Sequence, residues 1–129
     1  MKVKTIIIIA TIFGAVSVIT GAMGAHALKA VLTPEALTSY LTGSRYNMYH
    51  AIALLAIAGL STHLEQKWMK NGVLLISVGT ILFSGSIYLL STSSVSGIQL
   101  GSFLGPVTPI GGILIIFGWV SIALAAIKK

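Results

Sequence analysis

The sequence predicts an all-α membrane protein, a four-helix transmembrane bundle with antiparallel up-down-up-down topology. Of its 129 residues, 56% are hydrophobic and only 8% are charged, whereas soluble domains carry about 25% charged residues. The apolar residues form four long stretches, and about 20 apolar residues in a helix cross a bilayer. We therefore expect one membrane domain, residues 1–129, with spans at about 5–28, 45–64, 72–91 and 106–127.

The first stretch, 5–28, has an alternative interpretation as a signal peptide. It follows Lys2 and Lys4, and its end contains Ala25-His26-Ala27, an A-x-A pattern like that of a cleavage site. However, its length of 24 residues exceeds the usual 7–15 of a signal peptide core. The stretch is therefore expected to remain as the first membrane helix.

Small residues mark the helix faces that we expect to pack against protein. Spacings of three and four place such residues on one side of a helix, where two backbones can approach closely. We expect intramolecular packing through these faces, with a homo-oligomer as the alternative. The faces comprise Gly14, Ser17, Gly21 and Ala25 in the first span and Gly111, Ile115 and Gly118 in the fourth.

The second apolar stretch, residues 46–62, is the shortest of the four. The third span carries a stripe of hydroxyl groups. Residues at spacings of three or four indicate an inward face of the third helix, because hydroxyls in membrane helices bond to the carbonyl one turn earlier. A solute path along this stripe is the less favoured alternative. The stripe comprises Ser77, Thr80, Ser84, Tyr88 and Ser91.

The fourth span is expected to begin at one of two prolines, Pro106 or Pro109, since proline is accepted in the first turn of a helix. Thr108 between them is a candidate cap of that first turn. The preceding glycines, at every fourth residue from 97 to 105, fit either a helical seam or an irregular loop, and we favour the loop.

The distribution of basic residues predicts the orientation. Six lysines fall on one side if the four helices alternate, against Lys29 and Arg45 on the other. The positive-inside rule then places both termini in the cytoplasm of a cell-membrane protein. No basic stripe is present, so the net charge of +6 indicates membrane topology rather than nucleic-acid binding. The six are Lys2, Lys4, Lys67, Lys70, Lys128 and Lys129.

Polar chemistry is densest at the outer ends of the first two predicted spans. Arg45 would lie at a helix N-terminus, where free N–H groups and a guanidinium both favour an anion. We expect a non-enzymatic site there that binds, and in one version moves, a small anionic or amphipathic ligand such as an anionic lipid head group. The predicted ligand-binding residues are His26, Arg45, Tyr46, Tyr49 and His50, with Lys29 and Thr108 at the rim.

Two alternatives remain for this cluster. In the first, the protein is a structural or accessory membrane subunit whose polar residues only lock helices together, with Arg45 paired to Glu35 or anchored at the interface. In the second, His26 and His50 lie at similar depth and hold haem or copper. Neither histidine belongs to a recognised ligand motif, so no metal or cofactor is predicted.

Enzymatic activity is not expected. The chain has no cysteine and no aspartate, and Glu35 and Glu65 are its only carboxylate side chains. It contains no nucleophile elbow, no paired carboxylates, no phosphate-binding loop and no dinucleotide-binding glycine pattern. No catalytic residue is therefore predicted.

Four runs of the sequence resemble one family of small bacterial membrane proteins. The family is catalogued as domain of unknown function 423, or the UPF0382 membrane proteins, and has a eukaryotic relative named transmembrane protein 256. The resemblance extends over essentially the whole chain and implies a multi-pass inner-membrane protein with four helices and no assigned activity or cofactor. The runs are GAMGAHALK from Gly21, RYNMYHA from Arg45, FSGSIYL from Phe83 and LGPVTPIGG from Leu104.

Overall fold

The computed structural model describes all 129 residues, and the chain is helical apart from its connecting turns. Short helices lie in two of the connections: the 3-10 turn η1 (Ser61–His63), α4 (Ser93–Ser96) and α5 (Gly101–Leu104). The four long helices are α1 (Val3–Ala25), α2 (Pro34–Gly59), α3 (Gln66–Ser91) and α6 (Val107–Ile127).

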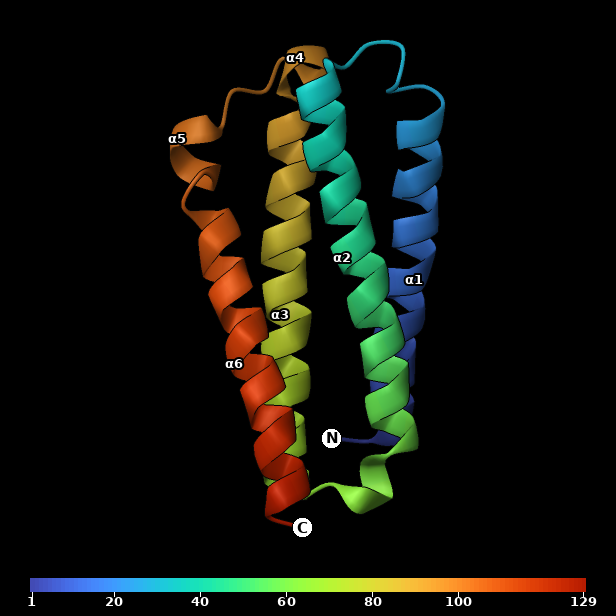
Figure 1. The fold of residues 1–129 in the computed structure, drawn as a ribbon, viewed down its shortest axis with the longest axis vertical. Helices are drawn as coiled ribbons and strands as arrows, with labels where there is room; N and C mark the ends of the chain where they lie inside the picture. The colour runs from blue at the N-terminus through green and yellow to red at the C-terminus, as the bar shows by residue number, and fades with distance from the viewer.

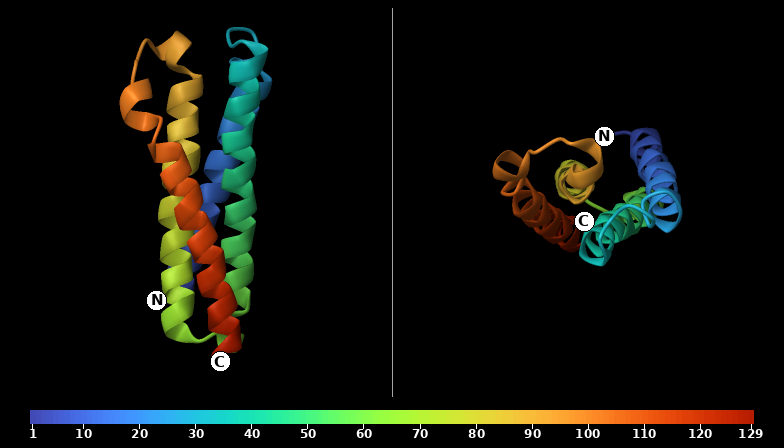
Figure 2. Two further views of the ribbon diagram at one scale, coloured as in Figure 1. Left: turned by 60° about the vertical axis from the view of Figure 1, so that its left-hand side comes forward. Right: turned by 90° about the horizontal axis from the view of Figure 1, so that it is seen from above.

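Successive long helices run in opposite directions, so both termini lie at the same end as η1, here called the lower end (Figure 1). The 26–33 loop and α4 lie at the opposite, upper end. The extended interfaces are α1 with α2, α2 with α3, and α3 with α6. The molecule is therefore two antiparallel helix pairs joined through α2 and α3, and α1 shares no extended interface with α3 or α6 (Figure 2).

Three segments have the length and apolar composition to cross a membrane: Val3–Ala25, Gln66–Ser91 and Gly101–Ile127. The prediction of four spans is therefore confirmed for the first, third and fourth. Although α2 has 26 residues, enough to cross, polar residues such as Thr38, Thr42 and Arg45 occupy its upper half. These residues lower its hydropathy and set it apart from the other three helices.

The predicted start of the second helix was wrong by eleven residues, since α2 begins at Pro34 and not at about 45. Thr33 is its N-cap, and its hydroxyl accepts a hydrogen bond from the Ala36 backbone N–H at 3.2 Å. Pro34 occupies the first helical position and Glu35 the first turn, both of which favour a helix start. The signal was present in the sequence but lay outside the apolar stretch.

Glycines bring the backbones of α3 and α6 together. A Cβ added at Gly79 would lie 2.8 Å from the Gly111 carbonyl oxygen, and one at Gly118 would lie 2.9 Å from the Ile76 backbone nitrogen. Gly111, Ile115 and Gly118 are all buried, so the contact face predicted for the fourth helix is confirmed. Such close approach maximises van der Waals packing, which must hold helices together where lipid removes the hydrophobic drive.

Serine hydroxyl groups form hydrogen bonds across the other two interfaces, α1 with α2 and α2 with α3. Ser17 of α1 and Ser44 of α2 donate to each other's backbone carbonyl oxygens, at 2.8 and 3.0 Å. Ser84 of α3 donates to the Gly43 carbonyl oxygen at 2.8 Å. Ser17 belongs to the small-residue face predicted for the first span, whereas Ala25 on that predicted face is exposed. The inward stripe of the third helix is also confirmed, because Ser77, Thr80 and Ser84 are buried.

The connection before α6 is the predicted irregular loop with one helical turn; a close-contact seam is not formed, because a Cβ added at Gly97 or Gly101 would meet no atom within 4 Å. Residues 97–100 form a loop, in which Gly97 has a φ of +73°, whereas residues 101–104 form the single turn α5. Pro106 precedes the first residue of α6, as expected. Thr108 does not cap this helix; its hydroxyl instead bonds to that of Ser86 on α3 at 2.5 Å.

Candidate functional site

The predicted outer cluster does not form as one site. Because α2 begins at Pro34, Arg45 lies eleven residues inside a continuous helix, about 16 Å from its start. It therefore has no helix N-terminus beside it, and the predicted reason for an anion site at Arg45 was wrong. Glu35 is ten residues away on the same helix, about 15 Å, so the predicted clamp between Glu35 and Arg45 is not formed either.

His26 and His50 lie at different depths. His26 follows the last residue of α1 at the upper end and is exposed. α1 and α2 are antiparallel, and Gly24 of α1 lies against Tyr40 of α2. His26, two residues after Gly24, is therefore nearly level with residue 39 of α2. His50 lies eleven residues further down that helix. The rise of a helix makes this about 16 Å. The two imidazoles are too far apart to hold one haem or copper ion, and that alternative was wrong.

His50 is buried and faces α6. Its Nδ1 donates to the Tyr46 carbonyl oxygen at 2.7 Å, and its Nε2 accepts a hydrogen bond from the indole N–H of Trp119 at 3.3 Å. These partners fix the neutral tautomer with its proton on Nδ1. Aromatic neighbours surround it, and the Tyr46 ring lies 6.2 Å from the imidazole and 5.1 Å from Phe83 of α3. His50 thus joins α2 to α6, and both of its ring nitrogens are occupied.

The other members of the predicted cluster are exposed. Arg45 and Tyr49 lie four residues apart on the outward side of α2, and the Tyr46 and Tyr49 rings meet edge to face at 5.6 Å. Lys29 lies in the loop after α1. Thr108 is eleven residues before Trp119, the partner of His50, hence about 16 Å above it along α6, and a lid of Thr108 over His50 is not formed.

Sequence reasoning missed a polar network between α1, α2 and α3. The Tyr88 hydroxyl lies 3.1 Å from that of Thr20 and accepts a hydrogen bond from the Asn47 side-chain amide at 3.3 Å. Thr20 also donates to Ser44 at 3.3 Å. Tyr40 packs on the Tyr88 ring at 5.3 Å between centroids. Only the hydroxyl stripe of the third helix gave a signal for this network, because its partners come from two other helices.

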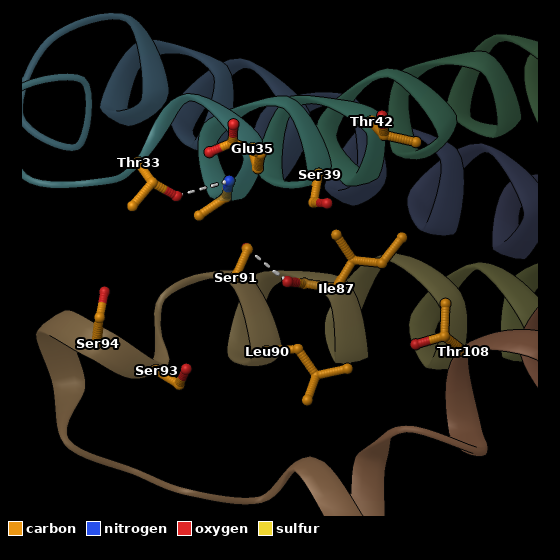
Figure 3. A pocket seen from close by; sticks show the side chains of 11 residues that line it. Thr33, Glu35, Ser39, Thr42, Ile87, Leu90, Ser91, Ser93, Ser94 and Thr108 are labelled. Carbon is orange, nitrogen blue, oxygen red and sulfur yellow. Dashed lines mark hydrogen bonds between the residues drawn. The ribbon is translucent and has the colours of Figure 1, made fainter.

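Hydroxyl groups also line the largest cavity, an open crevice of about 640 Å³ at the upper end (Figure 3). Residues from the start of α2 face the end of α3 across this upper crevice, and Ile87, Leu90 and Ala36 supply its apolar part. Glu35 is the one charged residue in the lining, whereas Arg45 and Lys29 are not part of it. The hydroxyl-bearing residues of the lining are Thr33, Ser39, Thr42, Ser91, Ser93, Ser94 and Thr108.

Several of these hydroxyls have no partner within the protein. Some of the lining hydroxyls do bond within the protein. Thr33 caps α2, Thr42 donates to the Thr38 carbonyl oxygen, and Ser91 donates to the Ile87 carbonyl oxygen. Ser39 and Ser94 make no hydrogen bond with the protein and are exposed. The crevice therefore offers free hydroxyls and one carboxylate beside apolar side chains, which suits a molecule with a polar head and an apolar tail.

Comparison with known proteins decides the family. The family model described as protein of unknown function DUF423 matches residues 20–112. The UPF0382 membrane protein YwdK of Bacillus subtilis is 36% identical over 126 residues, covering 97% of this chain and 98% of the relative. The chain belongs to the UPF0382 family. Residues 20–112 of this UPF0382 protein include every residue that lines the upper crevice.

Other UPF0382 relatives have the same extent. One from Haemophilus influenzae is 36% identical over 129 residues, covering all of this chain and 98% of its own. One from Schizosaccharomyces pombe is 40% identical over 112 residues, covering 86% of this chain and 92% of its own. These relatives are named as membrane proteins, in agreement with the apolar helices of the fold. No solved structure has significant similarity to the chain.

Proposed function

We propose that this UPF0382 protein crosses the cell membrane four times with both termini in the cytoplasm. The alternating directions of the long helices support this topology, since α2 connects two helices of membrane-spanning character (Figure 1). Lys2, Lys4, Lys67 and Lys70 lie in or beside the lower-end segments, together with the C-terminal lysines, as the positive-inside rule requires of a cytoplasmic side. Burial of Ser44, Asn47 and His50 of α2 against the neighbouring helices accommodates part of its polar character.

Within this topology, the protein acts without catalysis by binding a small amphipathic molecule in the upper crevice. The observation that carries this proposal is the lining itself, in which free hydroxyls and Glu35 lie beside Ile87 and Leu90 at the end of the helices. Lipid head groups lie at that depth of a bilayer. Hydroxyls bind the head of such a molecule and the apolar residues bind the beginning of its tail.

Glu35 decides the charge of the preferred head group. A carboxylate repels an anionic head and attracts an ammonium group, so the crevice selects a neutral or amine-bearing lipid. This differs from the anionic ligand expected from the sequence, which relied on Arg45 and Lys29. Arg45 remains the competing site for an anion because its guanidinium is exposed on the outward side of α2.

Native mass spectrometry of the protein released from nanodiscs tests the proposal. The nanodiscs contain equal amounts of phosphatidylethanolamine and phosphatidylglycerol. We expect a retained phosphatidylethanolamine, and about tenfold less retention in Glu35→Gln, because a hydrogen bond to a charged group is stronger than one to a neutral group. Arg45→Ala is the matched control, a charged residue of α2 outside the crevice, and retention should be unchanged. Loss of phosphatidylglycerol in Arg45→Ala would instead favour the anion site.

The second candidate is a structural or accessory subunit. The observation that favours it is His50, since both of its ring nitrogens are bonded within the chain and leave none for a ligand. On this hypothesis the protein carries no retained lipid in the experiment above. His50→Ala would then weaken a complex with another membrane protein, measured by co-purification of that partner.

A further inference from the structure

A second cavity, of about 300 Å³, lies between α1, α2 and α3, midway along the helices and away from the upper crevice. We propose that this middle cavity binds the hydroxyl end of an uncharged, membrane-soluble alcohol that enters sideways from the bilayer. The proposal is independent of the upper crevice, because the two cavities have no lining residue in common.

The mouth of the middle cavity is apolar and opens sideways. α1 packs along α2 and shares no extended interface with α3, which leaves a gap between α1 and α3. Ile12 of α1 and Ile81 of α3 line the cavity and are 55% and 59% exposed. Gly85 is also at the wall, and a Cβ added there would meet no atom within 4 Å. A molecule with an apolar tail can therefore enter from the membrane between these residues.

The inner wall is mainly apolar, but the polar residues Thr80 and Asn47 belong to it, and the Thr80 hydroxyl lacks a partner. Thr80 is 1% exposed, and its hydroxyl has no hydrogen-bond partner. A buried hydroxyl without a partner costs free energy, so most are satisfied. Thr80 lines the middle cavity, and its hydroxyl lies just beneath the wall surface. Rotation of the side chain to another staggered rotamer would present this hydroxyl to a group bound in the cavity.

Four other helical threonines of the same protein form hydrogen bonds within their own helix, whereas Thr80 does not. Thr11 donates to the carbonyl oxygen three residues earlier, and Thr20, Thr38 and Thr42 donate to the one four residues earlier. This is the usual way in which a helical threonine satisfies its hydroxyl. Thr80 makes no such bond although it lies within α3, and its hydroxyl remains free for another acceptor.

Asn47 supplies the complementary group. It is 4% exposed and lines the same cavity. Its side-chain NH2 donates to the Tyr88 hydroxyl at 3.3 Å, while its carbonyl oxygen receives no hydrogen bond from the protein. The cavity wall therefore offers one donor, at Thr80, and one acceptor, at Asn47. A single hydroxyl group satisfies both, because it accepts one hydrogen bond and donates another.

The electrostatics and the depth fit the same ligand. No charged residue lines the middle cavity, so an ionic head group would lose its hydration without a counter-charge. Thr80 is 14 residues from the start of α3 and 11 from its end, about 21 and 16 Å. A charged lipid head does not reach this depth, whereas an uncharged alcohol dissolves there. The volume is at the lower end for small-molecule sites and admits the polar end of such a molecule with part of its tail.

Photolabelling tests the site in the full-length protein in nanodiscs, with octanol carrying a diazirine as the probe. We expect labelled peptides from α1 and α3 around Ile12 and Ile81, with labelling displaced by unmodified octanol. Thr80→Val keeps the shape of the side chain and removes the hydroxyl. It should weaken octanol competition about 5- to 10-fold, the effect of one hydrogen bond.

Two further variants make the result decisive. Ser77→Ala removes another buried hydroxyl without a partner, which lies on the same side of α3 but does not line the cavity, and labelling should be unchanged. Gly85→Leu places a side chain in open space at the mouth and should block labelling while circular dichroism shows an intact fold. Equal labelling of the original protein and Thr80→Val would overturn the proposal and assign the Thr80 hydroxyl to water alone. Labelling that persists in Gly85→Leu would equally overturn it.

Discussion

At the lower end of the molecule, twelve buried apolar residues form one core to which α1, α2, α3 and α6 all contribute, including Ile6, Leu54, Val73 and Ala125. At the upper end the comparable cluster contains only Leu28, Leu32 and Tyr40. Hydroxyl groups replace apolar side chains there, and both candidate ligand cavities lie at or above the middle of the helices. The lower end also has a cavity, of about 560 Å³ between α3 and α6, but most of its lining residues are apolar. The lower end therefore has the larger apolar core, whereas free hydroxyl groups gather at the upper end.

This difference follows from how helices associate in lipid. Apolar burial gives little drive when the solvent is itself apolar, so the lower core must gain its stability from close packing. Hydrogen bonds between helices contribute modestly on average, about 0.6 kcal/mol each. An end held by serine and tyrosine contacts, with few buried apolar residues, is therefore expected to open more readily than one held by interlocked side chains.

The largest expected effect is at the lower core. Leu54→Ala removes a side chain that is fully buried and should lower the free energy of unfolding by about 2–5 kcal/mol, through lost contacts and the cavity left behind. Leu55→Ala is the matched control, since Leu55 is 44% exposed and faces away from the core; we expect less than about 1 kcal/mol. Reversible unfolding in mixed micelles measures both. Equal effects would remove the distinction between a packed core and lipid-facing residues.

A smaller effect is expected from the polar contacts of the upper half. Ser44→Ala removes the hydroxyl that donates to the Ser17 carbonyl oxygen and should cost about 0.5–1.5 kcal/mol in the same measurement. Ser39→Ala, five residues earlier on α2, removes a hydroxyl that has no partner in the protein and should leave stability nearly unchanged. If Ser44→Ala destabilised the protein as much as Leu54→Ala, both halves would depend equally on packing.

The smallest effect concerns pH and again locates stability at the lower end. Glu65 caps α3, and its carboxylate accepts hydrogen bonds from the Trp68 and Lys67 backbone N–H groups, which hold its pKa below the ordinary 4.5. A lowered pKa contributes stability above pH 4.5 that is lost as the pH falls through the value in the folded state. The melting temperature should therefore decrease between about pH 5 and pH 3.

Two variants identify the group responsible for this pH dependence. Glu65→Gln keeps an acceptor oxygen but cannot titrate, so the decrease should become smaller. Glu35→Gln changes the other glutamate, at the upper end, and should leave the pH dependence as it is. A pH dependence that disappears in Glu35→Gln would place the titrating group in the upper crevice instead.

The sequence by itself determined the helical class, the membrane character and three of the spans. Helices surrounded by lipid need apolar side chains along their length, so apolar runs of helical length identify them. It also indicated local pairing faces, since Gly111 and Gly118 reveal a close approach through their lack of side chains. The start of α2 was missed although Thr33, Pro34 and Glu35 carry the signal of a helix start. Hydropathy alone had set the boundary at the edge of the apolar residues.

Only the tertiary structure decided which polar residues meet. His26 and His50 were expected together because both were assigned to the same end, but eleven additional residues of α2 place His50 about 16 Å further down the molecule. The partner of His50 is Trp119, far away in the sequence, and the partner of Asn47 is Tyr88. Such contacts depend on how neighbouring helices are aligned along one another, and the spacing of residues along one helix does not encode that alignment.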